Sequence, residues 1–98
     1  MKKPYNNYPD RSGKINIFPR IDDGRFADVV IIGDPEGLRY LAKLLNWLAD
    51  SDQNQNDDPI GARFHTHLHF NEQLGEHSCE VELCRADAKG TGEYPDFM

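Results

Sequence analysis

Apolar and polar residues alternate over two stretches near the start of the chain. The first covers residues 15–20, and the second, which is rich in β-branched residues, covers residues 26–32. Alternation with this composition is typical of β-strands. Asp22, Asp23 and Gly24 lie between the two stretches and suit a tight turn. The pattern therefore predicts a β-hairpin.

A helix start follows the second predicted strand. Asp34 is a favourable N-cap, Pro35 suits the first helical position, and Glu36 complements the helix dipole. The apolar residues that follow recur every three or four positions: Leu38, Leu41, Leu45 and Leu48. A second stripe flanks them: Tyr40, Leu44 and Trp47. We predict an amphipathic helix over residues 35–49 with the leucine stripe facing the core, where the flanking stripe widens the buried face or stays exposed.

Two further alternating stretches, residues 63–70 and 78–86, predict two more strands. The order ββαββ predicts an α+β fold in which one helix packs on one face of a four-stranded, antiparallel-rich sheet. The stretch between the helix and the third strand, residues 50–58, holds no apolar residue and predicts a solvated loop. The expected core is apolar throughout: Leu38, Leu41, Leu45, Leu48, Val30, Ile32, Leu68 and Val81.

The two ends of the chain show no apolar period. Residues 1–13 predict a flexible leader with no core to join, and residues 88–98 predict a flexible tail. Residues 14–87 would then form a single α+β domain. At 98 residues, with 38% hydrophobic and 29% charged residues, the whole chain suits one soluble domain. It offers neither a transmembrane run nor a secretory signal, so we expect a cytoplasmic protein that binds no membrane.

The net charge of −6 is unevenly distributed, because residues 46–58 and residues 76–98 each carry −4. An acidic surface repels phosphate backbones and attracts basic partners. We therefore expect a basic protein partner and no nucleic acid. Cys79 and Cys84 would lie on opposite faces of one strand, with Cys79 toward the core, too far apart for a disulfide. Both are expected to be free thiols.

Three histidines alternate with Thr66, Leu68 and Phe70, which places all three imidazoles on the strand face away from the helix: His65, His67 and His69. The next strand would add Glu80 and Glu82 to this face. In the expected register His65 lies opposite Glu82, His67 opposite Glu80, and His69 opposite Ser78. This group is the candidate functional patch of the sequence: His65, His67, His69, Glu80 and Glu82.

Three interpretations of this patch stay open. It is a solvated polar face with cross-strand pairs, or a weak divalent metal site, or a catalytic strand. The catalytic interpretation depends on a resemblance to histidine triad nucleotide hydrolases, in which His67 would attack an α-phosphate. Thr66 and Asn71 depart from that pattern, and Glu80 and Glu82 would repel phosphate. We predict no catalytic residue, no resident metal and no cofactor.

Three segments, in this order and spacing, resemble the immunity protein 32 family: Gly37-Leu38-Arg39-Tyr40-Leu41-Ala42, His65-Thr66-His67-Leu68 and Ser78-Cys79-Glu80. The resemblance covers roughly residues 29–85, and His69 lies outside the family's His-x-His-Leu pattern. It implies a small cytoplasmic bacterial protein, not an enzyme, that neutralises a cognate toxin by binding it. Together with the charge, it favours a basic toxin as the partner.

Overall fold

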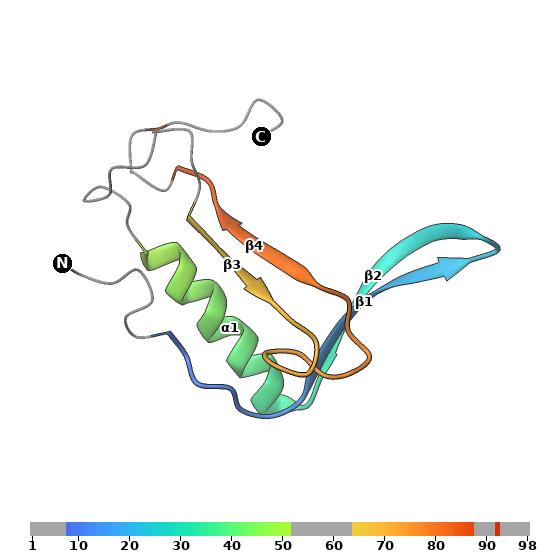
Figure 1. Cartoon of the computed structure of the whole chain (residues 1–98), viewed down its shortest axis with the longest axis horizontal. Coiled ribbons are helices and arrows are strands. Elements are labelled where there is room, and N and C mark those ends of the chain that lie inside the picture. Colours follow the sequence, from blue (N-terminus) through green and yellow to red (C-terminus); the bar gives the residue numbers. More distant parts are fainter. Residues whose placement is uncertain (1–7, 52–63, 88–91, 93–98) are drawn as a thin grey trace.

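The computed structural model describes residues 8–51, 64–87 and 92. Five elements follow one another along the chain (Figure 1): β1 (Ile15–Asp22), β2 (Arg25–Gly33), α1 (Pro35–Asp50), β3 (Phe64–Leu68) and β4 (Val81–Arg85). The α+β class and the order ββαββ are confirmed. The single four-stranded sheet is wrong, because the strands form two antiparallel two-stranded sheets, β1–β2 and β3–β4.

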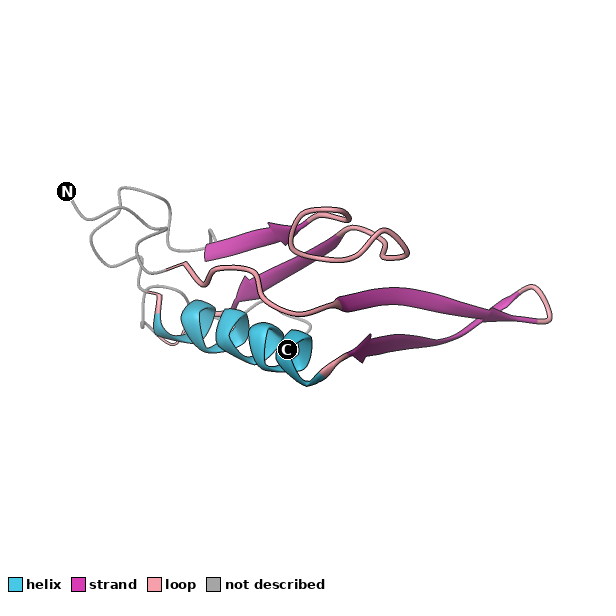
Figure 2. Cartoon of the chain, turned by 90° about the horizontal axis from the view of Figure 1, so that it is seen from below, coloured by secondary structure: helices cyan, strands magenta, loops and turns pink. Residues whose placement is uncertain are grey.

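The predicted first hairpin is confirmed. Asp23 and Gly24 have φ angles of 52° and 74°, so both central turn residues occupy the left-handed region that primed hairpin turns require. The ladder runs from Ile15 opposite Gly33 to Asp22 opposite Arg25, with a register shift after Arg20. Figure 2 shows the hairpin extending past the end of α1, while β3 and β4 lie along the helix. Most of β2 is therefore exposed.

The connection between β3 and β4 explains why the two sheets stay separate. Its backbone runs along β1: the Gly75 N–H donates to the Ile15 carbonyl at 2.8 Å, and the Cys79 N–H donates to the Ile17 carbonyl at 2.9 Å. The Ser78 hydroxyl accepts a hydrogen bond from the Ile17 N–H at 2.8 Å. These bonds occupy the backbone of Ile15 and Ile17 on the edge of β1 that faces away from β2, so β3 and β4 do not pair with β1 there.

The start of α1 is joined to the residue that precedes β1. The Asp34 carboxylate accepts from the Gly37 N–H at 2.7 Å and from the Lys14 N–H at 3.0 Å, and the Asp34 N–H donates to the Lys14 carbonyl at 3.0 Å. The predicted N-cap and Pro35 at the first turn are confirmed. The backbone N–H groups of Lys14 and Gly37 lower the pKa of Asp34.

The helix buries a different stripe from the predicted one. Leu38 and Leu45 are each 47% exposed and Leu41 is partly buried, so of the leucine stripe only Leu48 is fully in the core. The buried face consists of Gly37, Tyr40, Leu44 and Leu48. Gly37 explains this rotation, because a Cβ atom there would lie 2.0 Å from the Lys14 carbonyl oxygen. The glycine lets the flanking stripe approach the backbone before β1 closely.

The main core joins the helix to residues from both sheets and from the β3–β4 connection: Ile15, Ile17, Tyr40, Leu44, Leu68 and Leu74. Of the other predicted core residues, Leu68 is confirmed, and Val30 and Val81 are only partly buried. Ile32 is 58% exposed, which contradicts the prediction. It lies opposite Asn16, one residue away from the positions of β1 that face the core, so it points to the other side of the hairpin.

Tyr8 joins the folded part of the chain. Its ring contacts Trp47 edge-on at a centroid distance of 4.7 Å, and its hydroxyl lies 3.1 Å from the Thr66 hydroxyl oxygen. The Arg11 guanidinium also donates to the Glu72 carbonyl. The expectation that the leader has no core to join is therefore wrong at Tyr8, which packs against the main core and against Trp47.

Other predictions concern residues outside the described ranges. The first seven residues of the leader, most of the 50–58 loop and nearly all of the tail lie there. The domain boundaries at residues 14 and 87 stay predictions. Within the described ranges, no helix combines the length and apolar character needed to cross a membrane.

Candidate functional site: an exposed histidine and glutamate face

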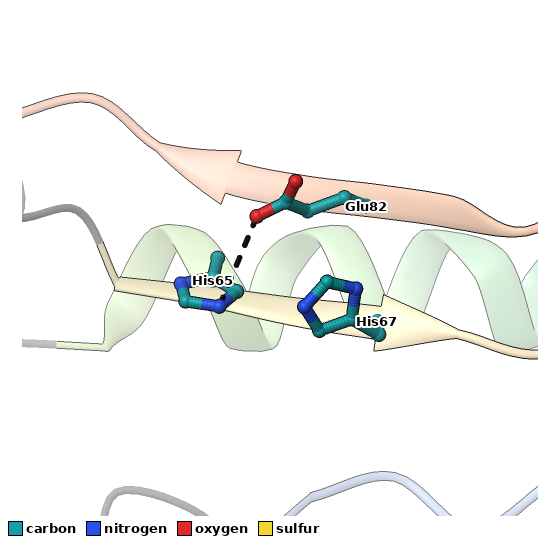
Figure 3. A group of neighbouring side chains, drawn as sticks. All are labelled: His65, His67 and Glu82. Atoms are coloured by element: carbon teal, nitrogen blue, oxygen red, sulfur yellow. Dashed lines mark ion pairs between the residues drawn. The ribbon is translucent and has the colours of Figure 1, made fainter.

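The two strands of the second sheet place the histidines outward. Thr66 and Leu68 of β3 are buried, so the alternating side chains of His65 and His67 point away from the core. His69 follows the end of β3 and is exposed as well. The predicted separation of a core face and a histidine face is confirmed within β3 (Figure 3). It is wrong at Phe70, which was expected on the core face but lies beyond the end of β3 and is 48% exposed.

The observed strand register differs from the predicted one by two residues. His67 lies opposite Glu82, and His65 lies opposite Cys84. A shift of two keeps every side chain on its predicted face, whereas a shift of one would have reversed the faces. The predicted register is wrong because the connection is longer than expected: β4 begins only at Val81, after the preceding segment has bonded to β1. Ser78 therefore supports β1 and does not face His69.

The glutamates contact the two outer histidines. The Glu82 carboxylate lies 3.8 Å from His65 Nε2, reaching diagonally across the strand pair (Figure 3). The Glu80 carboxylate lies within hydrogen-bond distance of His69 Nδ1. The middle imidazole, His67, meets the His65 ring edge-on at 5.1 Å and stacks on the His69 ring at 6.0 Å with an interplanar angle of 19°. The three rings thus form a continuous row.

The structure brings all five predicted site residues together, and we call them the His/Glu face: His65, His67, His69, Glu80 and Glu82. All five are exposed. Imidazole nitrogens and carboxylate oxygens on an open surface can exchange hydrogen bonds and ion pairs with a partner. Ligand atoms of His65, His67 and Glu82 also lie within 4.8 Å of one another, so these three could hold a metal ion.

The cysteines occupy different positions from those expected. Cys79 was predicted to face the core but is exposed, because it precedes β4 and its backbone is bonded to β1. Cys84 lies in β4 on the side of the histidines, as predicted, opposite His65. The two are not joined by a disulfide, in agreement with the strand-spacing argument. Asn16 is a supporting residue that the sequence did not reveal: its side-chain oxygen accepts from the His77 N–H at 3.2 Å.

Comparison with known proteins identifies the chain as one of the immunity proteins. A family model described as immunity protein 32 matches residues 28–86. Since the match covers more than half of the chain, the protein belongs to the immunity protein 32 family. The matched segment extends from β2 to just past β4 and includes the whole His/Glu face. Searches of curated proteins and of solved structures gave no match.

Proposed function

We propose that the protein is a non-catalytic immunity protein that neutralises a cognate toxin in the cytoplasm by binding it. The observation that carries this proposal is the family match, which spans α1 and the β3–β4 sheet. Immunity proteins of this kind act through a surface and not through a reaction, so an exposed face on a rigid sheet is the feature to expect.

The His/Glu face is the contact surface that we propose. Its side chains are exposed, while Thr66 and Leu68 on the reverse of the same strand are buried and fix the backbone. Glu80 and Glu82 contribute negative charge to a chain whose net charge is already −6. Such a surface attracts a basic toxin over a distance, raises its association rate and makes binding sensitive to salt.

The contacts of the histidines favour binding over nucleotide hydrolysis. In the hydrolase interpretation a phosphate would approach His67, the middle residue of the row. The carboxylates of Glu82 and Glu80 contact the histidines on either side of it, at His65 and His69. Two carboxylates so close to the approach path would repel a phosphate group, and they suit a cationic partner instead.

The test is affinity capture from a lysate of the source cells, with the purified full chain as bait and the partner identified by mass spectrometry. Capture is repeated at about 50 mM and 500 mM salt, because surface charge interactions are screened over this range. The captured toxin is then purified and its Kd measured. We expect a basic toxin whose affinity falls with salt and drops at least about tenfold in the double variant Glu80→Gln/Glu82→Gln.

A matched control removes the same charge elsewhere. Asp22→Asn/Glu36→Gln neutralises two exposed carboxylates, one at the hairpin turn and one in the first turn of α1. This control should bind within about twofold of the unchanged protein, because it leaves the His/Glu face intact. Equal loss in both variants would contradict the proposed surface. If no toxin is captured and the purified protein hydrolyses an adenosine phosphoramidate, the binding proposal is wrong.

A further inference from the structure

We propose that His65, His67 and Glu82 bind one zinc ion. The three side chains come from adjacent strands, and their ligand atoms lie within 4.8 Å of one another (Figure 3). The sequence suggested at most a weak site, because an open sheet surface offers few groups that would orient the ligands. In the structure Glu82 lies directly opposite His67, and its carboxylate leans toward His65. One carboxylate thus lies within 4.8 Å of a ligand nitrogen of each imidazole.

The geometry is close to that of a coordinated ion. Zinc binds imidazole nitrogen and carboxylate oxygen at about 2.0–2.2 Å, so neighbouring ligand atoms of a tetrahedral site lie about 3.4 Å apart. Closing the observed spread requires each side chain to move by about 1 Å. His65 and Glu82 can make this movement by rotation, because their side chains are 45% and 50% exposed.

The surroundings limit how far the ligands can depart from this arrangement. Thr66 and Leu68 are buried on either side of His67, which fixes the backbone of β3. The His69 ring lies nearly parallel to the His67 ring, with a centroid distance of 6.0 Å. Glu80 is paired with His69, whereas Glu82 forms the cluster with both proposed histidine ligands. A site on rigid strands loses less entropy when it binds an ion than one on a loop.

The ligand set selects the class of ion. Two imidazoles with one carboxylate suit zinc and its neighbours among the divalent transition metals, whereas magnesium and calcium prefer oxygen ligands throughout. Three protein ligands leave a fourth tetrahedral position. A water molecule or a group of a bound partner can occupy that position.

The test is calorimetric titration of the metal-free full chain with zinc chloride near pH 7, with magnesium chloride as a second titrant. We expect saturation at one zinc per chain and no saturable binding of magnesium. His67→Ala and, separately, Glu82→Gln should each weaken zinc binding at least tenfold. The matched control is His77→Ala, because His77 is an exposed histidine whose Nε2 lies 3.6 Å from the Glu76 carboxylate. This variant should bind zinc with the affinity of the unchanged protein.

Circular dichroism of each variant establishes that it is folded, and Glu82→Gln provides a second test if His67→Ala is not. Zinc binding without a one-to-one end point would overturn the proposal. So would equal affinities in His67→Ala, Glu82→Gln and His77→Ala. The proposal does not depend on toxin binding, so its failure would leave the proposed immunity function unaffected.

Discussion

Gly37 sits where the helix and the chain before β1 come closest. A Cβ atom there would lie 2.0 Å from the Lys14 carbonyl oxygen, a backbone atom that cannot rotate away. Gly37→Ala should therefore destabilise the protein by about 1–3 kcal/mol, although alanine is the better helix former by about 1 kcal/mol. Urea denaturation measures the change, and Asn46→Ala, at an exposed helical position, is the control. A Gly37→Ala variant more stable than the unchanged protein would contradict the close contact.

Asp34 links stability to pH at the level of a single carboxylate. The N–H groups of Lys14 and Gly37 lower its pKa below the ordinary value of 3.8. The stabilisation from its charge is thus fully present above the unfolded pKa and is lost as the pH falls through the folded pKa. Asp34→Asn retains a capping oxygen but does not titrate. Between pH 5 and pH 2.5, the urea midpoint of Asp34→Asn should fall less than that of the unchanged protein. Equal falls in the two urea midpoints would refute this.

At the scale of the helix, the two apolar stripes make opposite predictions. Leu44 is fully buried and Leu45 is 47% exposed. Leu44→Ala should cost about 2–5 kcal/mol, because it leaves a cavity in the core, whereas Leu45→Ala should cost about 0.5 kcal/mol or less. The two variants differ by one position and remove the same atoms, so denaturation midpoints compare them directly. A larger loss of stability in Leu45→Ala than in Leu44→Ala would contradict the observed burial of the two helix faces.

Local signals predicted the elements, and distant contacts decided how they pack. The Asp34 cap, Pro35 and the Asp23-Gly24 turn act within a few residues, so the sequence located the helix and the first hairpin. The His/Glu face followed from strand alternation alone. The helix rotation depended on Gly37 meeting Lys14, and the split of the sheet depended on residues 75–79 bonding to β1. Neither contact leaves a periodic signal in the sequence.

At the scale of the whole molecule, Tyr8 connects the start of the described chain to the helix and β3. Its ring covers Trp47, which is the single tryptophan of the sequence, and its hydroxyl meets Thr66. Tyr8→Ala should expose the indole to water, shift its fluorescence emission to longer wavelength and lower the urea midpoint. Tyr8→Phe retains the ring contact and should leave the emission unchanged. Identical emission in Tyr8→Ala and the unchanged protein would contradict this packing.

The proposed immunity function requires that the protein bind and neutralise a toxin in the cell. The most direct measurement is the survival of cells that express the captured toxin, with and without co-expression of this protein. We predict that the toxin alone stops growth, that the unchanged protein restores it, and that Asp22→Asn/Glu36→Gln restores it equally well. Glu80→Gln/Glu82→Gln, expressed at the same level, should protect less. Cells that die despite equal expression of the unchanged protein and the toxin would contradict the immunity function.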